Sequence, residues 1–275
     1  MAGTVVACLK HVALRVRVDP LTGDVSAEPH ATGMSDADRA ALEWALRLGE
    51  HWGRDVVAVT AGPAAAAGVL RTALAAGASR AVRADLPVDA ASDSVAAALA
   101  AAVPDGEVWL CGDHSLDRGS GSVPAFLAAQ VDAAQALGLV YLEPAGDGVL
   151  TAERRLDGAR RERLRVPAPA VLSVESATAR LRRAPLPALV DTRAADIAVT
   201  PAPSAVRREP AGHVRPFRPR ARSLPGPDPA LPARERLLVL TGALSERTPP
   251  RLVTAGPEEA ADELVRFLRD TGYLT

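Results

Sequence analysis

The residues best suited to chemistry lie together in one polar loop, Gly112 to Ser122. The loop reads GDHSLDRGSGS, so it combines glycines and serines with two aspartates, one histidine and one arginine. Unpaired backbone N–H groups at the start of a helix, together with the positive end of the helix dipole, can hold a phosphate. The loop is therefore a candidate phosphate cradle, and the alternative is a plain connection between a strand and a helix.

The same loop also holds the residue types of a catalytic triad, in Asp113, His114 and Ser115. These residues are neighbours on one loop, whereas triads draw their side chains from separate elements. We therefore expect no catalytic set in this chain. For Asp113 and Asp117 two roles stay open, capping of the loop backbone or contact with ribose hydroxyls.

Metal and disulfide chemistry is not indicated by the sequence. The five histidines are scattered along the chain, without the spacing of metal ligands. Cys8 and Cys111 are the only cysteines, and each lies in an apolar run. We interpret both as small buried hydrophobic residues, because two isolated cysteines make neither a disulfide framework nor a zinc site.

The polar loop must be positioned by the segments on either side of it. Residues 108–111, VWLC, form the short apolar run that is typical of a strand buried on both faces. Pro124 stands where a helix tolerates proline in its first turn, and the alanines and leucines after it predict a helix that continues toward Gly138.

The rest of the chain alternates between strand-like and helix-like segments. Strands are expected over 5–9, 55–60, 79–84, 139–142 and 170–175, and helices over 38–51, 68–76 and 92–103. Ser35 or Asp36 is expected to cap the first of these helices. Period-two alternation predicts a hairpin beginning at 15–18, and strands over 149–154 and 162–166 predict a second around Asp157–Gly158.

This alternation predicts an α/β fold, with a Rossmann-like parallel sheet covered by helices on both faces, plus a hairpin or extended arm and a terminal helix. Ligands of such sheets bind beyond the carboxyl ends of the strands. The loops after Leu9, Thr60 and Cys111 should therefore meet at one edge. We expect a nucleotide-binding domain over 1–200, a Pro/Arg-rich linker or docking arm over 201–236, and a strand (235–241) and an amphipathic helix (257–269) leading to the C-terminus.

The overall composition excludes several classes of partner. The 275 residues carry a net charge of -1, which gives no basis for nucleic-acid binding. No apolar segment reads as a signal peptide or a membrane span, so we expect a cytoplasmic protein without membrane insertion. The charged run from Glu153 to Arg163 is either an anion site or the charged face of an exposed hairpin, and the hairpin is the favoured interpretation.

Four segments, in order along the chain, resemble the β subunit of electron transfer flavoproteins. They are VVACLKHV with RVRVDPLTG, MSDADRAALEWALRLGE, VVAVTAGPAAAAGVLRTALAAGASRAVRADLP, and RRLDGARRERLRVPAPAVLSV. In the last segment the residues in register with the family signature are Asp157, Gly158, Glu162, Leu164, Pro169, Val171 and Ser173. The likeness covers nearly the whole chain.

The resemblance implies a non-catalytic electron carrier that forms a heterodimer with an α subunit. FAD would lie mainly on that α subunit, and this chain would hold AMP or a second FAD. A recognition loop near 180–190, with Pro185, Leu186 and Pro187, would contact a dehydrogenase donor. The implied nucleotide-binding residues are Cys8, Ser35, Asp36, Ala37, Asp38, Ala61, Gly112, Asp113, His114, Ser115, Leu116, Asp117, Arg118, Gly119, Ser120, Gly121 and Ser122.

This chain departs from the family pattern in several places. Ser35-Asp36-Ala37 replaces the family's Asn-Pro-Phe, and the acidic cluster of the nucleotide loop is reduced to Asp117 before Arg118. With the long Pro/Arg segment, these departures suggest an actinobacterial protein with a specialised partner, such as a dehydrogenase system linked to mycofactocin. Two alternatives stay open: a stand-alone adenine-nucleotide-binding regulatory module, and an enzyme that uses Asp113, His114 or Asp117.

Overall fold

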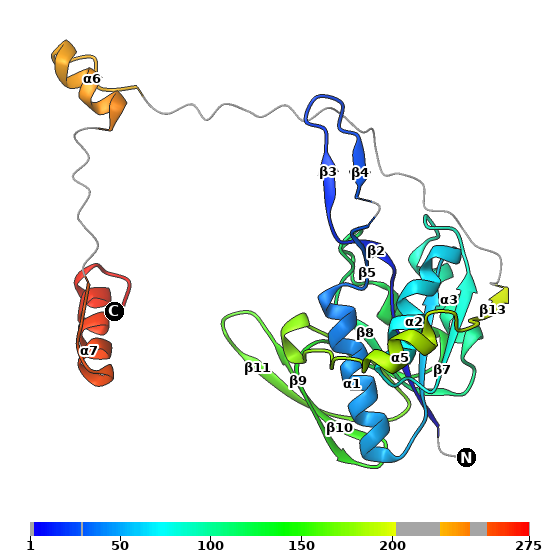
Figure 1. Cartoon of the computed structure of the whole chain (residues 1–275). Helices are drawn as coiled ribbons and strands as arrows, with labels where there is room; N and C mark the ends of the chain where they lie inside the picture. The colour runs from blue at the N-terminus through cyan, green and yellow to red at the C-terminus, as the bar shows by residue number, and fades with distance from the viewer. Residues whose placement is uncertain (1–2, 29, 202–225, 243–251, 275) are drawn as a thin grey trace. The chain divides into compact units, whose positions relative to one another are not determined.

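A computed structural model of the chain describes residues 3–28, 30–201, 226–242 and 252–274 (Figure 1). The chain divides into two compact units, Met1–Arg218 and Pro219–Thr275. The strands are β1 (Thr4–Cys8), β2 (Val12–Ala13), β3 (Val16–Val18), β4 (Val25–Ala27), β5 (Thr32–Gly33), β6 (Val56–Ala61), β7 (Arg80–Asp85), β8 (Gly106–Gly112), β9 (Ala134–Gly146), β10 (Val149–Arg155), β11 (Arg161–Pro167), β12 (Ala170–Val174) and β13 (Ala198–Pro201). The helices are α1 (Asp36–Trp52), η1 (Ala64–Ala66), α2 (Ala67–Ala76), α3 (Ser92–Ala102), α4 (Val123–Gln130), η2 (Ser176–Thr178), α5 (Leu186–Thr192), α6 (Ala233–Thr241) and α7 (Pro257–Asp270).

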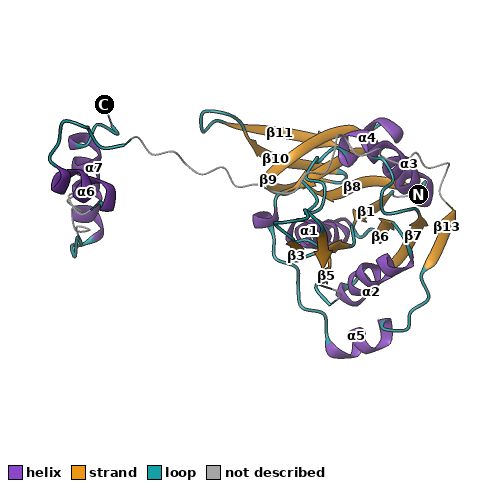
Figure 2. Cartoon of the chain, turned by 90° about the horizontal axis from the view of Figure 1, so that it is seen from above, coloured by secondary structure: helices purple, strands orange, loops and turns teal. Residues whose placement is uncertain are grey.

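The first unit is built on one large sheet, with the strand order β11-β10-β9-β12-β8-β1-β6-β7-β13. From β9 through β12, β8, β1, β6 and β7 to β13, each strand runs parallel to the next. Strands β10 and β11 extend the sheet beyond β9 as an antiparallel hairpin. Helices cover both faces of the sheet, with α1, α2 and α5 on one side and α3 and α4 on the other (Figure 2). The predicted α/β fold is therefore confirmed.

Alternation along the central strands decides which helices each side chain meets. In β1, Val5 and Ala7 lie in the core beneath α1 and α2, whereas Val6 and Cys8 lie in the core beneath α3 and α4. Both cores consist mainly of alanine, valine and leucine. A sheet buried on both faces needs such continuous apolar strands, which is why these runs could be recognised in the sequence.

Helix α1 brings its first turn to the carboxyl edge of the sheet. Of the two candidate caps, Ser35 is the N-cap, because its side chain accepts a hydrogen bond from the Asp38 backbone N–H at 3.1 Å. The helix ends at Gly53, whose φ of 64° is the left-handed conformation that glycine adopts without strain. The cap therefore fixes where Asp38 lies.

The structure corrects the expected helix after Pro124. This helix, α4, ends at Gln130, and Asp132 follows in a left-handed conformation with φ 49°. From Ala134 onward the chain is strand β9, longer than the strand expected over 139–142, and it pairs in parallel with β12. Pairing with a distant strand has overridden the helix propensity of the alanines and leucines.

Two further segments differ from the sequence expectation. Leu186 and Pro187 do not lie in an irregular loop, because Leu186 begins the short helix α5, which packs against α2. The strand expected over 235–241 is instead helix α6, which follows Pro232 and ends at Gly242 with φ 68°. Proline before the helix and a left-handed glycine after it are helix boundary signals, and they outweigh the strand-like apolar run between them.

The second unit contains α6 and α7. Helix α7 confirms the amphipathic helix predicted over 257–269, and Glu258 and Glu259 lie in its first turn. Residues 202–225 of the predicted Pro/Arg-rich linker lie outside the described residues. The proposed boundaries at 200 and 236 stay predictions.

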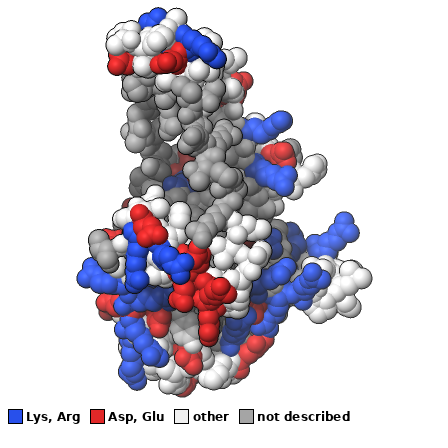
Figure 3. All heavy atoms as spheres, turned by 90° about the vertical axis from the view of Figure 1, so that its left-hand side faces the viewer, with Lys and Arg blue, Asp and Glu red and all other residues white. Residues whose placement is uncertain are grey.

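Ion pairs occupy the charged hairpin of β10 and β11. Arg154 pairs with Glu162 at 2.5 Å, and Arg161 pairs with Glu153 at 3.4 Å, across the two strands. On the face shown in Figure 3, acidic side chains gather between groups of basic ones. This pairing supports the interpretation as a solvated charged face, because Arg154 and Arg161 already have carboxylate partners.

Arg182 fixes the segment that leads to α5 against α1. Its backbone N–H and its Nε donate to Glu43 at 3.0 and 3.1 Å, and its guanidinium also contacts Glu50. Burial tends to raise the pKa of Glu43, but the hydrogen bonds from Arg182 and Arg47 outweigh it and hold that pKa below the ordinary 4.5. Arg182 thus joins two segments far apart in the sequence.

We predict that Arg182→Ala lowers the free energy of unfolding by about 1–3 kcal/mol, because it leaves a buried carboxylate with fewer partners. Arg47→Ala is the matched control, since Arg47 binds the same carboxylate from an exposed position, and it should cost about 0.5 kcal/mol. The stabilisation should be present above pH 4.5 and be lost as the pH falls through the lowered pKa of Glu43. Urea unfolding at several pH values measures it, and equal losses in the two variants would contradict it.

Candidate functional site

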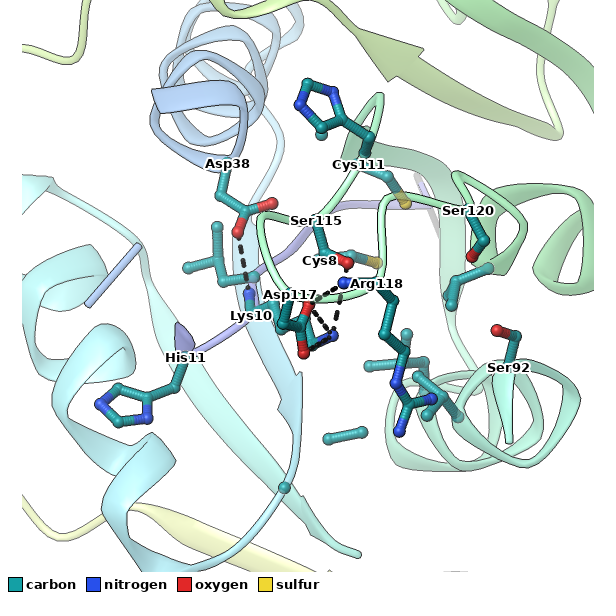
Figure 4. A pocket seen from close by; sticks show the side chains of 18 of the residues that line it. Cys8, Lys10, His11, Asp38, Ser92, Cys111, Ser115, Asp117, Arg118 and Ser120 are labelled. Atoms are coloured by element: carbon teal, nitrogen blue, oxygen red, sulfur yellow. Dashed lines mark hydrogen bonds and ion pairs between the residues drawn. The ribbon is translucent and has the colours of Figure 1, made fainter. Parts of the chain in front are cut away.

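A pocket opens at the carboxyl edge of the sheet, where the loops after β1, β6 and β8 meet as expected. Figure 4 shows its polar side chains gathered around Lys10 and Asp117. The predicted nucleotide-binding residues that line it are Cys8, Asp38, Ala61, Gly112, His114, Ser115, Asp117, Arg118, Ser120, Gly121 and Ser122.

The remaining predicted residues lie elsewhere. Ser35, Asp36, Ala37 and Leu116 line a second groove, together with residues of the segment 180–184. His114 borders both the pocket and this groove. Asp113 and Gly119 belong to the loop but are not in the lining of either.

Sequence reasoning missed one wall of the pocket and its lysine. The wall comes from the segment after β7 and from α3, and includes Val88, Ser92, Val95 and Leu99. Because β7 is parallel to β6, its carboxyl end lies at the same edge of the sheet. The loop after the strand expected over 79–84 could therefore have been identified as a wall of the pocket. Lys10, the only lysine of the chain, stands two residues beyond β1 and could have been identified in the same way.

Asp38 joins the ends of β1 and β8. Its carboxylate accepts the backbone N–H of Lys10 at 3.2 Å, and it also takes a backbone hydrogen bond from Gly112. The residue is only 7% exposed. Burial raises its pKa from 3.8 to about 6, and the hydrogen bonds from Lys10, Ser35 and Gly112 offset part of that effect.

Lys10 and Asp117 form an ion pair across the pocket. Lys10 Nζ lies 2.7 Å from both carboxylate oxygens of Asp117 and 3.4 Å from Ser115 Oγ. Partial burial acts to raise the pKa of Asp117, but the contacts with Lys10 and Ser115 hold it below its ordinary value. Lys10 is thus the cationic group that the pocket offers at this end.

Arg118 holds the loop against the opposite wall. Its guanidinium donates to the backbone carbonyls of Ala90 at 2.6 Å and of Val88 at 2.8 Å (Figure 4 shows the side chain directed toward α3). These bonds occupy both terminal nitrogens. In this conformation Arg118 positions the loop. From the sequence, Arg118 was expected among the nucleotide-binding residues.

The glycines of the loop allow a turn that other residues would obstruct. Gly119 and Gly121 have φ of 64° and 58°. A Cβ at Gly121 would lie 2.6 Å from the Asp113 carbonyl oxygen, whereas one at Gly119 would meet nothing closer than 4.0 Å. Tight backbone of this kind, at the start of α4, fits a phosphate cradle.

Cys8 and Cys111 are far apart in the sequence, which suggested two isolated cysteines, but they lie side by side in the fold. They are register partners on the parallel strands β1 and β8, and both line the pocket. The Cys111 thiol and burial together raise the pKa of Cys8 well above its ordinary value. Both are buried, as expected, but they form a pair.

The triad residue types in the loop are not arranged for catalysis. His114 Nδ1 lies 2.9 Å from Asp113, but the hydrogen bond of Ser115 is with Lys10 and not with His114. Within the described residues no group of three or more His, Cys, Asp or Glu side chains could hold a metal ion. A search of the same residues finds no helix with the length and apolarity needed to cross a membrane.

The pocket can hold a flat apolar group beside an anionic one. Ala66, Val95 and Leu99 supply apolar surface, the Gly-rich loop supplies backbone N–H groups and hydroxyls, and the segment after β1 supplies Lys10. An adenylate has these two parts, a purine ring and a phosphate. The donor set and the tight glycine turn therefore fit an adenine nucleotide.

Comparison with known proteins gives a matching family model and several relatives. Residues 24–205 match the family model described as the electron transfer flavoprotein domain. Protein FixA of Rhizobium meliloti (strain 1021) is 34% identical over 169 residues, which cover 56% of this chain and 57% of that protein. The electron transfer flavoprotein subunit beta of Thermoanaerobacterium thermosaccharolyticum is 31% identical over 147 residues, covering 52% and 56%. The chain thus spans little more than half the length of these relatives.

We predict that Asp38→Asn raises the free energy of unfolding at pH 7.5 by about 1–3 kcal/mol. The folded-state pKa of Asp38, about 6, lies above its ordinary 3.8, so the wild-type chain loses stability as the pH rises through this interval. The variant should lack this loss and should match the wild type near pH 4.

Asp117→Asn is the control, and its effect should have the opposite sign, because the pKa of Asp117 is lowered and its stabilisation is present at neutral pH. Thermal or urea unfolding from pH 4 to 8 measures both. A pH profile of Asp38→Asn that parallels the wild type would contradict the prediction.

Proposed function

The chain belongs to the electron transfer flavoprotein family, on its β-subunit side, and from that premise we propose that it carries electrons as the β subunit of a heterodimer. An α subunit would hold FAD, a dehydrogenase would supply the electrons, and the complex would work in the cytoplasm. The relatives named above are electron transfer proteins and not enzymes, which supports a carrier role for this chain.

The observation that carries the proposal is the family match over residues 24–205. It includes the wall residues Val88 to Leu99, the Gly-rich loop and the segment of Leu186. The matched region therefore contains the exposed recognition segment and most of the pocket, whose β1 and Lys10 side precedes it. The two features together suit a carrier that needs one internal nucleotide and one docking surface.

We further propose that the pocket holds an adenylate, either AMP or the adenylate half of a second FAD. The amides of Ser120 to Ser122 would receive the phosphate, Lys10 would contribute positive charge, and the wall of Val95 and Leu99 would pack on the purine. FAD, where bound, supplies the redox chemistry of the complex. The role of this chain's residues toward the nucleotide is to bind and orient it.

The proposed recognition surface lies at the start of α5. Leu186 is 74% exposed and Val190 is 63% exposed, both in α5, where Pro185 is the N-cap and Pro187 lies in the first turn. An exposed leucine on proline-stiffened backbone loses little conformational entropy when a partner covers it. Arg182, held by α1, fixes the approach of the chain to this segment. We propose Pro185, Leu186 and Pro187 as contacts for the dehydrogenase.

Co-expression with an electron transfer flavoprotein α subunit of the same genome tests the proposal. We expect the two chains to co-purify with a flavin absorption spectrum. Leu186→Ser should slow flavin reduction by the donor dehydrogenase about tenfold, because an anchor residue of an interface contributes about 1–2 kcal/mol.

Leu21→Ser, at a leucine that is 81% exposed in the turn between β3 and β4, is the control and should keep the wild-type rate. Both variants should still bind the α subunit. A soluble, well-folded chain that binds no α candidate, yet binds AMP, would favour the stand-alone nucleotide-binding module instead.

A second prediction concerns the loop. Gly121→Ala should weaken AMP binding by more than tenfold, because its Cβ would lie 2.6 Å from the Asp113 carbonyl and must displace the backbone. Gly119→Ala has the same left-handed strain with free space, and it should weaken binding by no more than about threefold. Titration calorimetry with AMP on the full chain compares them. Equal affinities in the two variants would argue against the loop as the phosphate site.

A further inference from the structure

Cys8 and Cys111 are adjacent because of the register of the central strands. They are Cα partners on β1 and β8, which run parallel, so both side chains leave the same face of the sheet. Both belong to the core beneath α3 and α4, with 7% and 5% of their surfaces exposed. No other cysteine is present in the chain.

The two thiols lie where a disulfide can form. Neighbouring strands of a sheet are about 4.8 Å apart, and disulfides join Cα atoms about 4.4–6.8 Å apart. Figure 4 shows the two sulfur atoms turned into the same space in the pocket.

The pocket gives a small oxidant a path to these thiols. Both cysteines line it, next to Asp38, Gly112 and Ser122. Neither cysteine has a part in the proposed electron transfer.

We propose that Cys8 and Cys111 are an oxidisable dithiol that closes to an intrachain disulfide in the floor of the pocket. Hydrogen peroxide supplies the oxidising equivalents. One thiol is oxidised to a sulfenic acid with release of one water, and the second thiol then displaces the hydroxyl as a second water and forms the S–S bond. Two thiols and one peroxide thus give one disulfide and two waters.

The disulfide would change the pocket without unfolding the chain. It brings the sulfur atoms to about 2.05 Å and ties β1 to β8 one residue before Gly112 and two before Lys10. A thiol reductant would reverse it. The reaction needs no nucleotide and no partner subunit, so it can be tested independently of the proposed function.

The test uses the full chain, reduced and then treated with hydrogen peroxide. Thiols are counted under denaturing conditions, and intact mass is measured without reductant. We expect the count to fall from two to zero, the mass to fall by two hydrogen atoms, and a peptide map to link the segments of Cys8 and Cys111. Reductant should restore both thiols.

Cys8→Ser and Cys111→Ser are the matched controls, and neither should form an intrachain disulfide. Phenylarsine oxide gives a second measurement that does not depend on oxidation, because one arsenic atom binds two neighbouring thiols with loss of one water. The wild-type chain should take one equivalent tightly, and each single variant should release it at least tenfold faster. Two thiols that persist, added oxygen atoms in place of lost hydrogens, or disulfides only between chains would overturn the proposal.

Discussion

The parallel register of β1 beside β8 is the constraint on which the rest of the site depends. It brings the ends of two strands about a hundred residues apart to one point, where Asp38 accepts a backbone hydrogen bond from each side. Every polar feature of the pocket extends from this point: Lys10 from the first strand, the Gly-rich loop from the second. A slip of one residue would move every side chain of a strand into the opposite core, and the fit between the sheet and its helices would be lost.

The charges of the pocket are arranged by partners inside the fold. Lys10 is held by Asp117, and Arg118 is held by two backbone carbonyls, so each cation is oriented before any ligand arrives. Asp38 also has partners inside the fold, but they offset its burial only in part. Its raised pKa therefore reduces the stability of the fold at neutral pH. A buried charge that costs stability is a common feature of sites that bind something.

Much of this was predictable from local pattern, and the rest depended on contacts distant in sequence. Apolar runs and capping residues were enough for the central strands β1, β6, β7, β8 and β12 and for Ser35 at the start of α1, but not for the edge strand β13. They could not reveal that residues 134–138 pair with β12, or that Cys8 lies beside Cys111, because both depend on register between distant segments. The direction of Arg118 was not predictable either, since its carbonyl partners belong to another loop.

The central claim is that this chain holds an adenylate in the pocket while its partner holds FAD. Mass spectrometry of nucleotides released by denaturing the purified heterodimer tests it most directly. We expect one FAD for the α subunit and one further adenylate for this chain, as AMP or as a second FAD, and loss of the second alone in Gly121→Ala. Release of a single FAD, with no other nucleotide from the wild-type complex, would contradict it.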